Sequence, residues 1–144
     1  MVCYSEETNN SLCFYDLTQK AIKSSLNNIN KKNNNFEWLI ILNKDLLFIP
    51  GENKITIINF NKYSIVKIID ASGSGWICNI CVLNENILLT GDRNKMIKEW
   101  KIEGDNLILI SQKEKAHNDF INYLINIGNC HIASASNDKA IKIW

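Results

Sequence analysis

The residue types that could perform chemistry gather near the end of the sequence. His117, Ser134 and Asp138 have the composition of a Ser-His-Asp catalytic triad, although the match is one of residue type only. The chain has 2 histidines, and the other, His131, lies in a predicted strand with no cysteine or histidine at metal-ligand spacing. The inventory therefore favours a protein that is not an enzyme and has no catalytic or metal-binding residues.

Two further patterns in the sequence could indicate functional sites. Residues 72–75 read SGSG, as in a phosphate-binding glycine loop, but no Lys-Ser/Thr pair follows and the next segment reads as a strand. A loop that precedes a strand is the favoured interpretation, and no cofactor is expected. The carboxylates Glu52, Asp92 and Glu99 show no pairing that the sequence can establish, so a solvated role is expected for each.

The elements that must position these residues are short strands. Residues 132–136 read IASAS, a short apolar strand, and residues 136–139 read SNDK, which supplies residues that tight turns favour. Residues 140–144 read AIKIW and alternate apolar with polar side chains, the pattern of a strand that packs on one face. The end of the chain is therefore predicted to be a hairpin.

The hairpin belongs to an internal repeat. Segments 36–60, 76–100 and 120–144 align without a gap, with a period of about 40 to 44 residues. In this register Phe36, Trp76 and Phe120 open the units, and Phe60, Trp100 and Trp144 close them. A partial unit precedes the three.

The last unit, residues 116–144, resembles a WD40 repeat, with His117, Ser134, Asp138 and Trp144 at the positions that define the motif. The resemblance implies an all-β fold, a WD40-type β-propeller built from four-stranded antiparallel blades. It also implies that these four side chains form a hydrogen-bonded relay that gives a buried indole N–H and a buried carboxylate the partners they need.

The length covers about three and a half blades, so the expected propeller is partial. We predict one segment: a partial blade over 1–26, an Asn-rich loop over 27–35, blades over 36–69 and 76–111, and a partial blade over 116–144. The strands would number 3, 4, 4 and 3. The chain is then expected to be a fragment, a truncated gene product or a half-ring, completed by further blades or by a second chain.

The other units keep fewer of the relay residues. The third has Thr90 for the serine, Asn94 for the aspartate and Gly73 for the histidine, so an incomplete relay is predicted. The second has Pro50, Lys54 and Phe60 at the serine, aspartate and tryptophan positions, so it is predicted to depend on apolar packing.

Partner binding is the use that the resemblance implies, through the rim that carries the loop before each first strand and the turn between the second and third strands. The rim residues are Trp76, Phe36, Phe120, Asn53, Arg93 and Asn137. Trp76 and Arg93 lead, because aromatic and arginine side chains dominate binding hot spots. The alternative for Trp76, Phe36 and Phe120 is that each packs between blades.

Composition sets the remaining expectations. The chain has 144 residues and a formal net charge of +1, which gives no electrostatic reason to expect nucleic acid. No apolar run approaches the length of a membrane span and no secretory leader is evident, so a cytoplasmic or nuclear protein is expected. The 5 cysteines are scattered through predicted strands and are expected to be reduced packing residues.

Together these observations predict a non-catalytic scaffold that binds protein or peptide partners. The alternative is a regulatory or substrate-receptor propeller segment of a larger enzyme or ubiquitin-ligase complex.

Overall fold

The computed structural model describes residues 2–5, 11–27, 29, 40–41, 45–71 and 73–144. The described residues form strands, turns and loops, and none of them forms a helix long and apolar enough to cross a membrane. Phe36, Trp38 and Asn9 lie outside the described residues, and so does most of the Asn-rich loop.

Four antiparallel sheets follow one another along the chain. The first sheet contains β1 (Val2–Ser5), β2 (Ser11–Asp16) and β3 (Ala21–Leu26). The second sheet contains β4 (Ile40–Ile41), β5 (Leu46–Gly51), β6 (Lys54–Asn59) and β7 (Ser64–Asp70). The third sheet contains β8 (Ile77–Asn84), β9 (Ile87–Asp92), β10 (Ile97–Glu103) and β11 (Asn106–Lys113). The fourth sheet contains β12 (Ile121–Gly128), β13 (His131–Ser136) and β14 (Ile141–Ile143).

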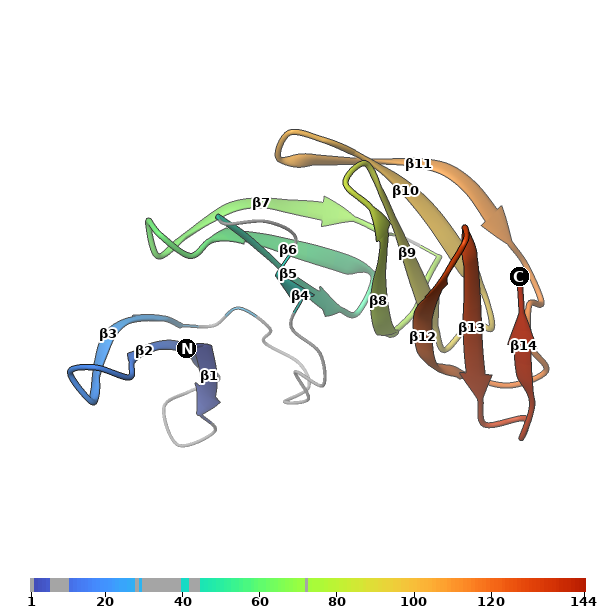
Figure 1. Cartoon of the computed structure of the whole chain (residues 1–144), viewed down its shortest axis with the longest axis horizontal. Helices are drawn as coiled ribbons and strands as arrows, with labels where there is room; N and C mark the ends of the chain where they lie inside the picture. The colour runs from blue at the N-terminus through green and yellow to red at the C-terminus, as the bar shows by residue number, and fades with distance from the viewer. Residues whose placement is uncertain (1, 6–10, 28, 30–39, 42–44, 72) are drawn as a thin grey trace.

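Within each sheet, strands that are adjacent in sequence are hydrogen-bonded neighbours. The sheets succeed one another in chain order across the molecule, with the first sheet at one end and the fourth at the other (Figure 1). In the described residues the strands number 3, 4, 4 and 3, so this prediction is confirmed. The β5–β6 turn is hydrogen-bonded to the loop before β8, and the β9–β10 and β13–β14 turns both contact the residue that precedes β12, so these three turns lie on one rim.

Inner and outer strands differ in burial for a reason visible in their sequences. β6 reads KITIIN and is buried over its four central residues, as expected of a strand covered on both faces. β7 and β11 are the outer strands of their sheets and keep most of their side chains exposed. Exposed isoleucine and leucine side chains on these strands contribute little to the core, which lies between the sheets.

Apolar clusters fill the three junctions between consecutive sheets. The first and second sheets share Leu12, Phe14, Leu47, Ile49 and Ile58. The second and third share Phe48, Ile55, Ile57, Ile77, Ile80, Leu88 and Trp100. The third and fourth share Cys81, Leu89, Ile97, Ile121, Leu124 and Ile132. Burial of these side chains is the main force that holds each sheet against the next.

At the junction between the third and fourth sheets, β9 and β12 approach each other closely. A methyl group at Gly91 in β9 would lie 2.7 Å from Cγ2 of Ile121 in β12, well inside van der Waals contact. Asn79 is buried in the same junction, and its Oδ1 accepts the backbone N–H of Leu124 at 3.1 Å. The fourth sheet is therefore fixed against the third by close packing and by a buried polar contact.

The cysteine prediction is partly wrong. Cys13, Cys78 and Cys81 are free and buried, as expected of packing residues, whereas Cys130 is free and exposed in the β12–β13 turn. Cys130 lies in the turn between two strands and outside the buried clusters, which leaves its side chain open to solvent. The Cys3 side chain lies outside the described part of the chain.

Candidate functional site

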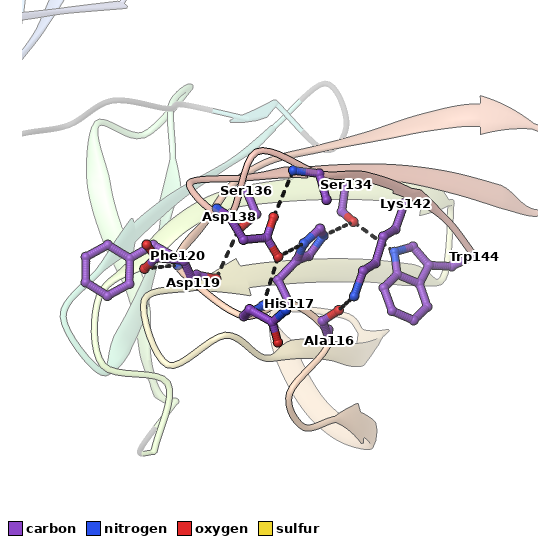
Figure 2. A network of polar contacts seen from close by, with 11 residues as sticks. Ala116, His117, Asp119, Phe120, Ser134, Ser136, Asp138, Lys142 and Trp144 are labelled. Carbon is purple, nitrogen blue, oxygen red and sulfur yellow. Dashed lines mark hydrogen bonds and ion pairs between the residues drawn. The ribbon is translucent and has the colours of Figure 1, made fainter.

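Four predicted side chains of the last unit are brought together by hydrogen bonds (Figure 2). Trp144 Nε1–H donates to Ser134 Oγ at 2.9 Å, Ser134 Oγ lies 2.7 Å from His117 Nε2, and His117 Nδ1 lies 2.9 Å from Asp138 Oδ2. One arrangement of protons satisfies every group: neutral His117 donates from Nδ1 and accepts the Ser134 O–H at Nε2, while Ser134 Oγ accepts the indole N–H. We refer to Trp144, Ser134, His117 and Asp138 as the relay.

The relay ties together four pieces of backbone. Ser134 lies in the middle of β13, where it pairs with Leu124 of β12 and Lys142 of β14. His117 comes from the loop between β11 and β12, and Asp138 comes from the β13–β14 turn. The backbone of Trp144 exchanges two hydrogen bonds with Ile132, at 3.0 and 3.2 Å, which holds the indole beside β13. The series of side-chain hydrogen bonds therefore fastens the loop between β11 and β12 to the fourth sheet.

Asp138 is the most heavily hydrogen-bonded member of the relay. Its Oδ2 accepts the backbone N–H of Asn118 at 2.9 Å as well as the His117 contact, and its Oδ1 accepts the N–H of Ala140 at 2.9 Å. The Asn118 amide, followed by the His117 ring and the Ala140 amide, holds the pKa of Asp138 well below its usual range. The carboxylate therefore stays ionised at any pH near neutrality.

A second set of contacts secures the same loop. Lys142 Nζ donates to the backbone carbonyl of Ala116, and its ammonium group lies 5.7 Å from the ring centre of Trp144. Ser136 Oγ donates to the carbonyl of Asp119 at 3.1 Å. In Figure 2 the Phe120 ring points away from the relay and takes no part in this network of polar contacts.

The order of contacts from Ser134 to His117 to Asp138 is that of a Ser-His-Asp triad, but the surroundings differ. Ser134 and His117 are each 1% exposed. Ser134 Oγ already accepts the indole N–H of Trp144, and this bond engages a lone pair of the oxygen. An attacking serine needs a substrate carbonyl within reach of its oxygen, whereas Ser134 Oγ is buried and hydrogen-bonded within the chain. The observed hydrogen bonds cross-link backbone segments of the fourth sheet.

The third sheet keeps only part of this network. Trp100 Nε1–H donates to Thr90 Oγ1 at 3.0 Å, which is the counterpart of the Trp144–Ser134 bond. Asn94 Nδ2 donates to the carbonyl of Gly73 at 2.7 Å and so joins the β9–β10 turn to the preceding loop. No imidazole is present between the two bonds, because Gly73 replaces the histidine.

Sequence reasoning missed the buried charges of the third sheet. Asp92, expected to be solvated, is 0% exposed, so that prediction is wrong, because the end of β9 packs against the loop before β8. Lys98 is buried too, and its ammonium nitrogen lies 3.8 Å from the position that a Cβ of Gly73 would take. The repeat alignment offered one signal, since it pairs Asp92 with Ser136 and Lys98 with Lys142, both of which contact the loop in the fourth sheet.

Asp92 is only partly satisfied. Its Oδ1 accepts the N–H of Met96 at 2.9 Å, but Asp92 Oδ2 and Ser74 Oγ are buried and have no hydrogen-bond partner among the described residues. Burial raises the pKa of Asp92 to about 6, and the Met96 amide opposes that shift. This carboxyl group therefore changes its protonation close to neutral pH.

The second sheet is held by apolar packing. Phe60, at the tryptophan position, packs against the cluster shared with the first sheet, and Pro50 is buried. Lys54, at the aspartate position, donates from Nζ to the carbonyl of Ile29 at 3.4 Å. Within the described residues of this sheet these positions form no chain of polar side chains.

On the rim, the structure joins three of the predicted partner-binding residues. The guanidinium carbon of Arg93 lies over the Trp76 ring, 5.5 Å from its centre, and over the Phe120 ring, 5.6 Å from its centre. Arg93 is exposed, Trp76 is half-buried and Phe120 is 38% exposed. Trp76 and Arg93 belong to the third sheet and Phe120 to the fourth. We call these three side chains the aromatic–arginine stack.

Equivalent backbone bonds position the stack in both sheets. The N–H of Arg93 donates to the carbonyl of Trp76 at 2.9 Å, and the N–H of Asn137 donates to the carbonyl of Phe120 at 3.0 Å. Each bond places the first residue of a turn beside the aromatic residue that opens its unit. The Arg93 side chain then extends from one unit to the aromatic residue of the next.

The remaining rim predictions are not part of this stack. Asn53 is exposed, but its Oδ1 accepts the N–H of Gly75 at 2.9 Å and its own N–H donates to the Gly75 carbonyl at 2.7 Å, so it joins the turn to the next loop. Asn137 is exposed and its Oδ1 accepts a hydrogen bond from Asn122. Phe36 lies outside the described residues.

Among the described residues, no group of three or more histidine, cysteine, aspartate or glutamate side chains lies close enough together to hold a metal ion.

With the geometry established, comparisons with known proteins define the fold. No protein-family model matches the sequence, and no curated protein matches it. A chain in the crystal structure of the mitotic checkpoint complex is similar, with a TM-score of 0.75 and 14% sequence identity. The similarity covers 99% of this chain and 44% of that chain, so this chain spans less than half of the length of its structural neighbour.

The fold is a partial β-propeller. The likeness to a solved structure and the succession of antiparallel sheets confirm the predicted fold class. At 14% identity the likeness shows the fold alone. The assignment to the WD40 family therefore remains a prediction from the residues of the last unit.

Proposed function

We propose that this chain is a non-catalytic scaffold that binds protein or peptide partners through the rim formed by the β9–β10 and β13–β14 turns and the loops before β8 and β12. The observation that carries this proposal is the aromatic–arginine stack. An exposed arginine between a half-buried tryptophan and an exposed phenylalanine is the composition typical of binding hot spots.

The rest of the molecule supports this role over catalysis. The Ser134, His117 and Asp138 side chains are used internally, with Ser134 and His117 buried. The rim residues lie on a frame that the relay and the packing of Gly91 against Ile121 make rigid. A rigid frame lowers the entropy lost on binding, which favours affinity. The likeness to a chain of a multiprotein complex is in keeping with a binding role.

The competing explanation is that the stack only fastens the third sheet to the fourth. The two explanations predict different results, because the junction is already filled by Leu89, Ile97 and Ile121 beneath the rim. If the stack serves recognition, truncating it weakens binding and leaves stability nearly unchanged. If the stack serves packing, truncating it lowers stability, and binding weakens only as far as the fold is lost.

The test is site-specific photo-crosslinking in extracts of the source organism. A photoreactive amino acid at Asn137 samples the proposed rim, and one at the exposed Asp105, in the β10–β11 turn, samples the opposite rim. We expect a discrete crosslinked partner from position 137 and none of the same mass from position 105. Phe120→Ala should reduce the yield at least five-fold.

Tyr123→Ala supplies the matched control, because Tyr123 is 40% exposed, much like Phe120, but lies on β12 and outside the stack. We expect it to leave the crosslinking yield within two-fold of the unmodified chain. The proposal would be contradicted if Phe120→Ala and Tyr123→Ala reduced the crosslinking yield equally. It would also be contradicted if Phe120→Ala lowered the melting temperature enough to account for its loss of yield.

A further inference from the structure

We propose that Arg93 in the aromatic–arginine stack is a receptor for a carboxylate of an acidic peptide segment, with Trp76 and Phe120 contacting the apolar side chains beside that carboxylate. This inference rests on the proposed function and adds the chemical class of the partner.

The identity of the residue supports this inference. Arg93 is the single arginine among 16 basic residues of the chain, the others being lysine. A lysine would place a charge near the rings equally well. A guanidinium is planar, stacks on aromatic rings and still offers its N–H groups in a fork that matches a carboxylate.

The guanidinium N–H groups of Arg93 are not used within the described chain. Trp76 and Phe120 approach the guanidinium with their rings, which supply no oxygen acceptor. No carboxylate of the described residues lies within ion-pair distance of Arg93. Glu52 is exposed and its backbone is bridged to that of Trp76, yet its carboxylate makes no such pair. The fork is therefore available to an external oxyanion.

The other charges on this rim also favour an acidic partner. Asp138 is engaged by His117 and by the N–H of Asn118, and Asp119 Oδ1 accepts the N–H of Phe120 at 2.8 Å. Lys95 and Lys139 occupy equivalent positions of the β9–β10 and β13–β14 turns, with φ values of 68° and 67°. The Asp138 and Asp119 carboxylates are thus directed at backbone amides, while the cations of both turns remain available to attract an acidic segment.

Pre-organisation of Arg93 also favours this interaction. An exposed arginine ordinarily loses much side-chain freedom when it forms a two-point contact. Here both rings restrict the Arg93 side chain before any partner arrives, and the bond from its N–H to the Trp76 carbonyl fixes its backbone. Less entropy is therefore lost when a carboxylate binds.

The experiment uses the full chain labelled with ¹⁵N and three synthetic peptides of the same length. The first carries two glutamates flanking a leucine, the second has glutamines in their place, and the third has one phosphoserine in place of a glutamate. Because the chain has a single arginine, its side-chain Nε–H gives one resonance that reports on Arg93. We expect the glutamate peptide to shift it saturably and to bind at least ten-fold more tightly than the glutamine peptide.

Two variants separate the fork from simple charge. Arg93→Lys should weaken binding of the glutamate peptide at least ten-fold, although the charge is kept, whereas Lys95→Gln should change it less than three-fold. Unchanged amide resonances elsewhere would show that Arg93→Lys stays folded.

Absence of saturation with the glutamate peptide, equal affinity for the glutamine peptide, or full binding by Arg93→Lys would overturn the inference. Tighter binding of the phosphoserine peptide than of the glutamate peptide would overturn it in favour of a phosphate receptor. If these results appear while Phe120→Ala still reduces the crosslinking yield at position 137 at least five-fold, the proposed function stands and only the acidic preference fails. Loss of both results rejects both.

Discussion

The third and fourth sheets make the same connection with opposite polarity. In the fourth, the turn residue Asp138 accepts the N–H of Asn118 in the preceding loop, at 2.9 Å. In the third, the turn residue Asn94 donates to the carbonyl of Gly73 in the equivalent loop, at 2.7 Å. Both sheets thus join a turn to a loop. The comparison shows that the connection is maintained although the donor and acceptor are exchanged.

The two sheets also place their buried negative charge at different points. In the fourth, Asp138 is held by two amides and by His117, and its pKa is lowered. In the third the carboxylate is Asp92, two residues earlier, and its pKa is raised to about 6 because burial outweighs the opposing effect of the Met96 and Asn94 amides. The complete relay therefore stabilises the charged form of Asp138, whereas burial in the third sheet destabilises the charged form of Asp92.

Replacing the central residue of the relay should have the largest effect on this comparison. His117→Phe keeps an aromatic ring at this position but removes one hydrogen-bond partner from each of Ser134 and Asp138, so we expect the free energy of unfolding to fall by about 3 kcal/mol. Urea unfolding monitored by tryptophan fluorescence measures it.

His131→Phe is the control, because His131 is exposed at the start of β13 and should change stability by less than about 0.5 kcal/mol. Similar losses for the two histidine variants would show that the relay contributes nothing beyond ordinary packing.

Close packing of the two sheets predicts the next effect. Gly91→Ala places a methyl group 2.7 Å from Ile121, so β9 and β12 must separate, at a cost of about 2 kcal/mol. Ala135 is the aligned residue of the fourth sheet and is half-buried. Ala135→Gly should cost less than about 1 kcal/mol. Thermal unfolding of both variants tests the ranking, and a neutral Gly91→Ala would refute the described approach of the strands.

The buried charge predicts a dependence on pH. The pKa of Asp92 is about 6 in the folded chain, above its ordinary value of 3.8, so the folded chain binds more protons than the unfolded chain between these values. The Asp92 contribution therefore makes stability fall as pH rises from about 4 to about 6.

Asp92→Asn keeps an acceptor for Met96 and places a donor near the unpaired Ser74 hydroxyl. We expect it to stabilise the chain at pH 7.5 by on the order of 2 kcal/mol and to have little effect near pH 4. Urea unfolding at both values measures it, and an equal gain at both would show that ionisation of Asp92 is not the cause.

Exchange of polarity at the turn should have the smallest effect. Asn94→Asp replaces the donor to Gly73 with a carboxylate that faces the same carbonyl oxygen, but Asn94 is exposed and water can reach it. We expect a loss of about 1 kcal/mol, reduced at low pH where the carboxyl group is protonated. A gain in stability at pH 7 would show that the loop adjusts to accept either polarity.

The sequence was sufficient for the fold class and for the main members of the repeat. Alternating apolar residues, turn signals and a repeat of about 40 residues predicted four groups of strands, because strand periodicity and turn chemistry are local properties. The relay residues came from the resemblance of the last unit to a WD40 repeat, which implied a hydrogen-bonded role for His117, Ser134, Asp138 and Trp144. Boundaries were less accurate: β10 extends to Glu103, beyond the predicted end at Trp100.

Contacts between sheets were decided by the tertiary structure. The sequence marked Trp76 and Arg93 as one pair but did not show that Arg93 also reaches Phe120, 27 residues later, because that contact depends on the angle between two sheets. Burial of Asp92 and Lys98 was missed for a similar reason. A charged residue at a strand end has the same local pattern whether it faces water or a neighbouring loop, and only the packing of that loop excludes the water.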